Sequence, residues 1–364
     1  MRIGIIAPPF ISIPPPLYGG TELFIGQLAL GLKAQGIDVV VYTNGQSNLP
    51  GIDVRWLYPE SEWPIKGEIF ANLKDLNHGA WAVHDAMDSC DIIHLNNAAG
   101  LSHSRFVNQP FVYTIHHPLE PALLEFYRLN PWINYVCISK FQCDQHKLAN
   151  SRTIHHGIDL SLYKSQETKK DYLSFLGRIA PVKGTHLAIE VAMKTGIPLK
   201  IAGEIQPMFK DYFNAKIKPH IDGKFIEYVG EADLQTKNEL LGNSMAMLFP
   251  IQWDEPFGLV VVEAMACGTP VLALPGGSVP ELVKDGISGF VCKSVAEMTS
   301  RVKKFADGSR IAPCTVRQYV EQNFSVERMV KDYLNLYQEL LSGTEAVGDV
   351  LATEEPAEPQ GTAA

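Results

Sequence analysis

The chain has 364 residues, of which 46% are hydrophobic and 20% are charged, and its formal net charge at pH 7 is −9. This length and composition predict a globular protein of two or three domains. The negative charge argues against nucleic acid or anionic lipid as the main partner. No stretch reaches the ~20 apolar residues of a transmembrane helix, and the first residues do not read as a signal peptide. Peripheral contact with a membrane is left open.

The six cysteines show neither a C-x-x-C pair nor a zinc-ligand spacing, and most of them lie in apolar segments. A free cysteine in such a segment behaves as a small buried hydrophobic residue, so a reducing cytoplasm is the expected location. The chain also lacks an Asp-x-Asp pair and an H-E-x-x-H motif. We therefore expect no metal site and no cofactor.

Short apolar runs alternate with helical patterns in two successive sets. Strands of the first set are predicted at residues 3–7, 39–43, 54–57, 92–95, 112–115 and 135–138. Helices of the first set are predicted at residues 21–35, 67–88, 98–107, 119–129 and 140–149. Strands of the second set are predicted at residues 172–176, 199–202, 225–229, 245–249 and 271–274. Such alternation indicates parallel sheets with helices on both faces, which is an α/β fold.

A polar and charged stretch at residues 157–171 separates the two sets and predicts a linker. We therefore expect an N-terminal domain at residues 1–156 and a C-terminal domain at residues 172–324. A last helix is predicted at residues 325–341. The remaining residues, 342–364, form an acidic tail without aromatic side chains, so this tail is expected to be disordered.

The most informative motif begins at Glu255. This residue precedes Pro256, and a residue before proline is disfavoured in the α region, so Glu255 is expected on a loop after a strand. A helix that begins near Gly258 carries Glu263 just over one turn inside. Its N-terminus offers unpaired N–H groups that suit a diphosphate, and carboxylates accept hydrogen bonds from hydroxyls. The motif predicts an anion site between two hydroxyl-binding glutamates; an ordinary α/β unit with surface glutamates is the alternative.

Two cations follow the first strand of the second set. Arg178 and Lys183 lie in the stretch FLGRIAPVKG, ahead of a helix that begins near Gly184. Arginine can bind a diphosphate in a bidentate manner, and lysine can bind it as a point charge. Such cations would favour the transition state in which a nucleoside diphosphate departs. Two solvated surface charges are the alternative interpretation.

Gly19 and Gly20 lie in a loop after the first strand, and Thr21 opens the next helix. Glycine allows backbone N–H groups to approach a phosphate closely, although turns also use such pairs. The chain has no G-x-G-x-x-G and no G-x-x-x-x-G-K-[ST] motif, so dinucleotide and P-loop sites lose their support.

These motifs resemble the retaining, nucleotide-sugar-dependent glycosyltransferases of family 4, also called glycosyl transferases group 1. The family signature is a glutamate, seven residues and a second glutamate, as in Glu255 and Glu263. The resemblance covers about residues 1–341 and is strongest at 172–291. It implies the GT-B fold, with two Rossmann-like domains facing a central cleft. In that fold the acceptor is bound mainly by the first domain and the donor by the second, and the helix at 325–341 crosses back onto the first domain.

The resemblance also implies roles for individual residues. The implied donor-binding residues are Gly19, Gly20, Arg178, Lys183, Tyr228, Val229, Glu255, Phe257, Gly258, Leu259 and Glu263. The implied catalytic set is His116, Arg178, Lys183 and Glu255. His116 would bond a hydroxyl of the transferred sugar, while His117 and Ser139 would lie on the acceptor side. Ser139 could equally be a helix N-cap. Glu281 is expected near the sugar-phosphate end of the donor.

The implied function is retaining, metal-independent transfer of a hexose in carbohydrate metabolism. The donor would be a UDP-sugar such as UDP-glucose, or a GDP-sugar, and the acceptor hydroxyl is not identified. Lipid, polysaccharide, pigment and small metabolite all stay open as acceptors. The alternatives are another GT-B enzyme, such as a sugar-nucleotide epimerase or a sugar phosphorylase, and a sugar-nucleotide-binding protein without turnover.

Overall fold

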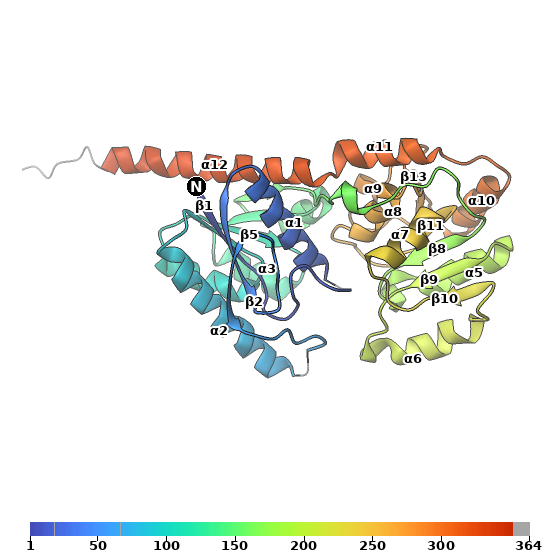
Figure 1. Cartoon of the computed structure of the whole chain (residues 1–364), viewed down its shortest axis with the longest axis horizontal. Helices are drawn as coiled ribbons and strands as arrows, with labels where there is room; N and C mark the ends of the chain where they lie inside the picture. Colours follow the sequence, from blue (N-terminus) through green and yellow to red (C-terminus); the bar gives the residue numbers. More distant parts are fainter. Residues whose placement is uncertain (18, 66, 352–364) are drawn as a thin grey trace, which may run out of the picture.

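The computed structural model describes residues 1–17, 19–65 and 67–351. Two α/β units lie side by side, and one long helix runs along the first of them (Figure 1). All strands in both sheets pair in parallel. The predicted α/β class with two parallel sheets is therefore confirmed.

The first unit contains a seven-stranded sheet in the order β3-β2-β1-β4-β5-β6-β7. Its strands are β1 (Arg2–Ile6), β2 (Asp38–Asn44), β3 (Asp53–Tyr58), β4 (Ile92–Leu95), β5 (Phe111–Ile115), β6 (Asn134–Cys137) and β7 (Ser151–Thr153). Its helices are α1 (Gly20–Ala34), α2 (Glu68–Met87), the 3₁₀ helix η1 (Ala98–Phe106), α3 (Pro121–Arg128) and α4 (Lys140–His146). All six strands predicted here are present. Strand β7 escaped prediction because it has three residues and no apolar run.

The second unit contains a six-stranded sheet in the order β10-β9-β8-β11-β12-β13. Its strands are β8 (Leu173–Leu176), β9 (Leu199–Ala202), β10 (Ile226–Tyr228), β11 (Ala246–Phe249), β12 (Val271–Ala273) and β13 (Gly289–Val291). Its main helices are α5 (Thr185–Thr195), α6 (Lys210–Tyr212), α7 (Leu234–Gly242), α8 (Leu259–Ala266), α9 (Val279–Leu282), α10 (Val295–Ala306) and α11 (Pro313–Asn323). In both sheets the chain order reverses beside the central strands, and open parallel sheets bind ligands in the crevice at such a point.

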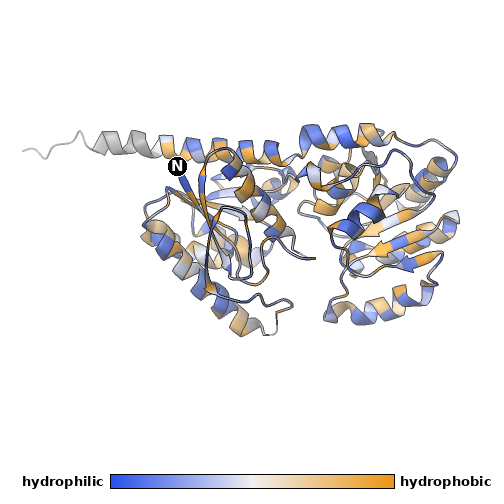
Figure 2. Cartoon of the chain, in the orientation of Figure 1, coloured by the Kyte–Doolittle hydropathy of each residue, from blue (hydrophilic) through white to orange (hydrophobic). Residues whose placement is uncertain are grey.

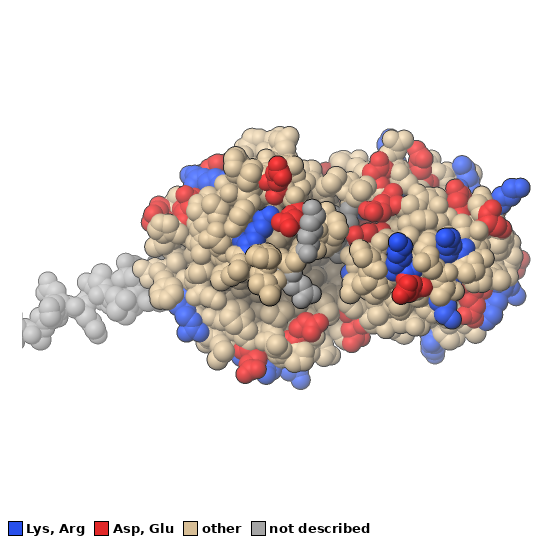
Figure 3. Space-filling view, turned by 90° about the horizontal axis from the view of Figure 1, so that it is seen from below, with Lys and Arg blue, Asp and Glu red and all other residues tan. Residues whose placement is uncertain are grey.

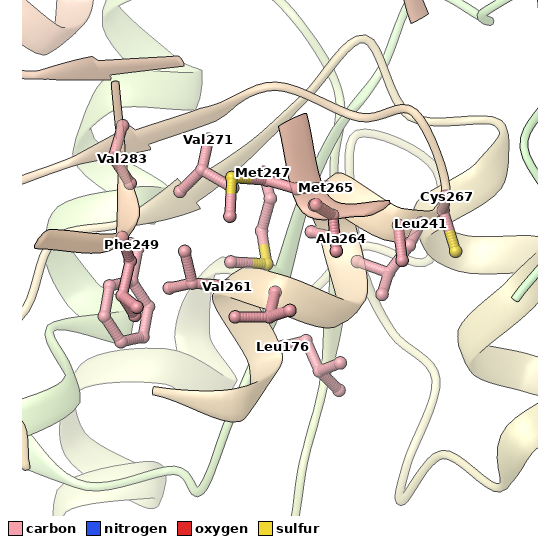
Figure 4. Packing of buried hydrophobic residues seen from close by; sticks show 14 of the residues in the cluster. Leu176, Leu241, Met247, Phe249, Val261, Ala264, Met265, Cys267, Val271 and Val283 are labelled. Atoms are coloured by element: carbon pink, nitrogen blue, oxygen red, sulfur yellow. The ribbon is translucent and has the colours of Figure 1, made fainter. Parts of the chain in front are cut away.

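The central strands of both sheets are apolar, and Figure 2 shows orange strands inside each unit. Strands of a parallel sheet that helices cover on both faces have this composition. Seen from below in Figure 3, the two units meet at a narrow waist, with Lys and Arg interspersed among Asp and Glu on this face. Figure 4 shows the core between the second sheet and α8. There Val261 and Met265 of α8 pack with Met247 and Phe249 of β11. This packing fixes the helix, and therefore the loop before it, against the sheet.

Residues 157–171 connect the two sheets and are anchored by long-range hydrogen bonds. Ile158 forms a parallel bridge with Ser325, so the two chain crossings between the units are hydrogen-bonded to each other. The N–H of Ile158 donates to the carbonyl of Phe324 at 2.9 Å, and the N–H of Val326 donates to that of Ile158 at 3.0 Å. Tyr163 is also buried. Apolar residues spaced through the polar stretch contribute to this anchoring.

Helix α12 (Val326–Leu351) returns to the first unit, where its buried side chains join the core beside α1. A Cβ on Gly31 of α1 would lie 2.4 Å from Cγ2 of Val330, so the two helices approach very closely. The helix was expected to end at Leu341. It continues because no proline occurs before Pro356, and a glycine such as Gly343 costs a helix only about 1 kcal/mol. Disorder was predicted for residues 342–364; α12 includes residues 342–351, and residues 352–364 lie outside the described residues. None of the helices among the described residues combines the length and the apolar composition of a membrane span.

Candidate active site

A cavity of about 840 Å³ lies between the two units. The predicted residues that line this cavity are Gly19, Gly20, His116, His117, Arg178, Lys183, Glu255, Phe257, Gly258, Leu259 and Glu263. They come from loops and helix starts at the carboxyl ends of strands in both sheets. The fold therefore brings most of the sequence-predicted site residues into one cleft.

Two helix N-termini face each other across the cleft. Helix α1 begins at Gly20 and α8 begins at Leu259, and a Cβ on Gly20 would lie 3.4 Å from Cδ1 of Leu259. Gly19 and Gly258 precede them with φ angles of 148° and 95°, which side chains rarely permit. A Cβ on Gly19 would also lie 2.7 Å from Pro15. Because helix N-termini carry unpaired N–H groups and partial positive charge, the arrangement suits an anion.

The loop after β8 supplies the two cations. Nζ of Lys183 lies 4.6 Å from the ring centre of Trp253 and donates to Oε2 of Glu255 at 2.5 Å. Nη1 of Arg178 donates to Oε1 of Gln206 at 3.3 Å, while its Nε is buried without a hydrogen-bond partner. A buried N–H without a partner costs free energy, so the Nε N–H of Arg178 has an unsatisfied hydrogen-bonding capacity.

Glu255 lies on the loop after β11 and is 8% exposed. Its Oε2 accepts hydrogen bonds from Lys183 and from Nε1 of Trp253 at 2.9 Å. The loop is held from behind, because the N–H of Ser278 donates to the carbonyl of Glu255 at 2.9 Å. Gly277 is required there, since a Cβ would lie 2.2 Å from that carbonyl oxygen. The carboxylate is thus fixed in position before any ligand binds.

Glu263 lies inside α8 and is 1% exposed. Its Oε1 accepts from the hydroxyl of Tyr163 and from Nζ of Lys237, each at 2.9 Å. Burial raises the pKa of the Tyr163 hydroxyl, which keeps it protonated as a donor. Oε2 of Glu263 is buried and has no hydrogen-bond partner. This oxygen therefore has an unused capacity to accept a hydrogen bond.

His116 and His117 follow β5 and also line the cavity. Asn96 turns its Oδ1 toward His116, so Nε2 of His116 donates to it at 2.8 Å and Nδ1 is left as an acceptor. Burial, with smaller effects from neighbouring histidines such as His156, holds the pKa of His116 well below its usual range. His116 is therefore neutral at pH 7. His117 is engaged differently, with Nε2 bonded to the hydroxyl of Tyr127 at 2.6 Å.

Three predicted site residues do not line the cavity. Ser139 accepts from the N–H of Gln142 at 3.1 Å and caps α4, so the structure accounts for it by the alternative interpretation. Tyr228 supports the wall from behind, because its hydroxyl donates to the carbonyl of Gly203 at 2.7 Å. Val229 packs against the core. Strand β10 ends at Tyr228, and the cavity wall is formed by the residues that follow it, so the role of Tyr228 and Val229 in donor binding stays a prediction.

Other residues of the wall were not predicted. Those on the second unit include Tyr163, Glu204, Glu231, Ala232, Asp233, Leu234, Lys237 and Trp253. The carboxylates among them lie on the loops after β9 and β10, where the strand ends could have signalled them. No local motif marks Lys237. In the described part of the chain, no group of three or more His, Cys, Asp or Glu is placed to hold a metal ion.

Comparison with known proteins identifies the class. The model for Glycosyltransferase Family 4 matches residues 18–162, and the model for Glycosyl transferases group 1 matches residues 163–310. The fold is that of the GT-B glycosyltransferases, and the chain is a glycosyltransferase. The chain belongs to the family 4, or group 1, glycosyltransferases.

Similar proteins span about three quarters or more of the chain. Spore coat protein SA of Bacillus subtilis (strain 168) is 23% identical over 391 residues, covering 93% of this chain and 99% of that protein. D-inositol 3-phosphate glycosyltransferase of Mycolicibacterium smegmatis is 26% identical, with 74% of each chain covered. AviGT4, a glycosyltransferase involved in avilamycin A biosynthesis, matches with a TM-score of 0.71 and 22% identity over 94% of this chain and 98% of its own. Anabaena Alr3699/HepE in complex with UDP and glucose matches with a TM-score of 0.73 and 20% identity over 93% and 99%.

Proposed function

We propose that this glycosyltransferase moves a hexose from a nucleoside-diphosphate sugar to an acceptor hydroxyl, with retention of configuration and without a metal ion. UDP-glucose is the favoured donor and a GDP-sugar is the alternative. The observation that carries the proposal is that Arg178, Lys183 and the N-termini of α1 and α8 line one cavity between two fixed glutamates.

The diphosphate would bind at these positive groups. Arg178 has an unpartnered Nε, and two helix starts add partial positive charge from opposite sides. Charge grows on the diphosphate as the glycosidic bond breaks, so fixed donors stabilise the transition state more than the ground state. This cluster would take the part that a divalent cation has in other transferases.

The two glutamates would bind the two ends of the donor. Oε2 of Glu263 lacks a partner, which suits a ribose hydroxyl, and Tyr163 and Lys237 hold the carboxylate in place. Glu255 and His116 would bind hydroxyls of the sugar. Nδ1 of neutral His116 is an acceptor, so it suits a hydroxyl donor better than it suits proton abstraction.

Retention requires that the acceptor attack from the side on which the diphosphate leaves, or that a covalent intermediate form. Glu255 is engaged by Lys183 and Trp253, which leaves it less suited to act as a nucleophile. We favour same-side attack, in which an oxygen of the departing phosphate takes the proton of the acceptor hydroxyl as the new bond to carbon forms.

The UDP preference rests on relatives. The HepE structures are described as complexes with UDP, with UDP and glucose, and with UDP-glucose. A cytoplasmic location is also part of the proposal, supported by the fact that all six cysteines are unpaired.

A donor panel tests the proposal. UDP-, GDP- and ADP-sugars are compared by thermal shift, since a ligand that binds the folded state raises apparent stability. Release of nucleoside diphosphate without acceptor then separates a transferase from a binding protein without turnover. Stabilisation and slow hydrolysis by one donor are expected; no stabilisation by any nucleotide sugar would refute the proposal.

A further inference from the structure

One carboxylate of the second unit is held by three donors from the first. Glu281 lies in α9, and its Oε2 accepts from the N–H of Lys140 at 2.8 Å while its Oε1 accepts from the N–H of Phe141 at 2.7 Å. Both N–H groups belong to the first turn of α4. Nε2 of His155 lies 2.8 Å from the same Oε2. Glu281 was expected beside the donor; it instead joins the two units away from the cavity lining.

The contact is charge-assisted. Burial alone would raise the pKa of Glu281, but the hydrogen bonds from His155, Phe141 and Lys140 together hold it below its usual range. The carboxylate is therefore ionised at pH 7. Hydrogen bonds from helix-terminal N–H groups to an ionised carboxylate are among the stronger ones in proteins.

Glu281 is directly connected to the active-site loop. Three residues before it, Ser278 donates from its N–H to the carbonyl of Glu255 at 2.9 Å and from its Oγ to that of Phe257 at 2.6 Å. The N–H of Glu281 in turn donates to the carbonyl of Ser278 at 2.8 Å. Hydrogen bonds through one short turn thus connect Glu281 to the loop that carries Glu255.

We infer that Glu281 is a positioning residue that latches the second unit onto α4. This latch sets the position of Glu255 opposite His116 and His117, which line the cleft on the first unit.

The latch lies beside the two crossings, because the His155 ring is 5.9 Å from that of Phe324, whose carbonyl accepts from Ile158. It adds a side-chain contact to the backbone bridge between Ile158 and Ser325, so the two together restrict rotation of one unit against the other. The inference rests on the proposed function for its consequence, because a loosened cleft admits water to a sugar that the acceptor should receive.

The N-terminal position of Lys140 permits a sharp test. Proline is well tolerated at the first position of a helix, and Ser139 before it is extended, with φ −149° and ψ 158°. Lys140→Pro therefore removes one N–H donor and leaves Glu281 intact. Lys140→Ala removes the same exposed side chain but keeps the N–H. Glu190→Gln, on a surface pair within α5, is a control for loss of a carboxylate.

Glu281→Ala should lower kcat for transfer about tenfold, leave the Kd for UDP within about twofold, and raise the share of donor lost to hydrolysis. Lys140→Pro should shift kcat and the hydrolysis share in the same direction by a smaller factor. Lys140→Ala and Glu190→Gln should match the wild type. The inference would be overturned if both Glu281→Ala and Lys140→Pro had the kcat of the wild type and lost the same share of donor to hydrolysis.

A measurement without substrate separates this inference from the proposed function. Small-angle scattering of the ligand-free protein should give a larger radius of gyration for Glu281→Ala and Lys140→Pro than for Lys140→Ala. Equal radii would overturn the latch even if the wild type is an active transferase. A larger radius in a protein that binds no nucleotide sugar would keep the latch and refute the proposed donor.

Discussion

Nζ of Lys183 and Oε2 of Glu255 lie 2.5 Å apart, so the cation proposed for the diphosphate and the carboxylate proposed for the sugar are paired with each other. Both side chains are largely buried, and Trp253 closes the pair from one side. Removing one partner of such a pair leaves a buried charge uncompensated, which costs more than the pair itself contributes. Lys183 and Glu255 should therefore be energetically coupled.

Replacing Lys183 or Arg178 with alanine should lower kcat/KM by ~10²-fold or more, because each would stabilise the departing diphosphate. Steady-state kinetics with the best donor of the panel give the values. The double variant Lys183→Ala/Glu255→Gln should lose less than the product of the two single losses, because its residues are in contact. Strictly multiplicative losses would show that the pair is not coupled.

The two glutamates should separate nucleotide binding from sugar transfer. Glu263→Gln loses the charge that accepts from Tyr163 and Lys237, so calorimetry should show weaker binding of free nucleoside diphosphate. Glu255→Gln should bind the nucleotide nearly as the wild type does and lose sugar transfer. Equal losses of nucleotide affinity in the two variants would contradict this division.

Metal removal should have no effect on turnover. The proposed charge stabilisation comes from Arg178, Lys183 and two helix N-termini, none of which a chelator removes. Turnover of protein dialysed against EDTA should equal that of untreated protein. Loss of turnover with EDTA, restored by Mg²⁺ or Mn²⁺, would contradict the metal-independent mechanism.

The contact between α12 and the first sheet should make stability depend on pH. His94 is buried between Tyr337 and Thr114, at 2.7 and 2.8 Å, and burial lowers its pKa from 6.5 to about 3. As pH falls, His94 is protonated in the unfolded chain before it is protonated in the folded protein. Its contribution to the free energy of unfolding is therefore complete above pH ~6.5 and is lost as pH falls toward 3. Urea unfolding at pH 7 to 5 measures this loss.

Two variants isolate the effect of His94. His94→Gln should reduce the slope of the free energy of unfolding against pH by up to about 1.4 kcal/mol per pH unit, the value for one proton. Tyr337→Phe should lower stability at every pH and leave the slope unchanged, because His94 still titrates. An unchanged slope in His94→Gln would show that this residue is not the titrating group.

The close approach of α1 to α12 gives a stability prediction. Gly31→Ala places a methyl group against Val330 and should destabilise the fold by about 1–3 kcal/mol through overpacking. Gly343→Ala is the matched control, since a Cβ there meets nothing within 4 Å and alanine favours a helix. Equal melting temperatures for Gly31→Ala and the wild type would contradict the packing.

The sequence was sufficient where chemistry is encoded locally. Glu255 and Glu263 stand in one strand–loop–helix segment, and Arg178 follows a single strand, so spacing and periodicity place them. Local spacing does not predict contacts between residues that are far apart in the sequence. Tyr163 meets Glu263 across 100 residues, and Phe141 meets Glu281 across 140. These contacts form only when the helices and loops pack together in the folded protein. No short sequence pattern specifies that packing.

Strand ends also limit what the sequence can place. Tyr228 reads as the last residue of a strand that should reach the ligand, yet the cavity wall is built by the loop after it, at residues 231–234. A difference of three residues separates a supporting side chain from a lining one, and boundary prediction is not that accurate. The apolar residues in the predicted linker were likewise too sparse to indicate that it folds against Ser325.

The crystal structure of the complex with UDP, or with the donor that the panel selects, tests the central claim most directly. The account predicts the diphosphate between the N-termini of α1 and α8, within hydrogen-bonding distance of Arg178 and Lys183. It also predicts a ribose hydroxyl on Oε2 of Glu263. A nucleotide bound with its phosphates away from both cations, or outside the cavity between the two units, would contradict the account.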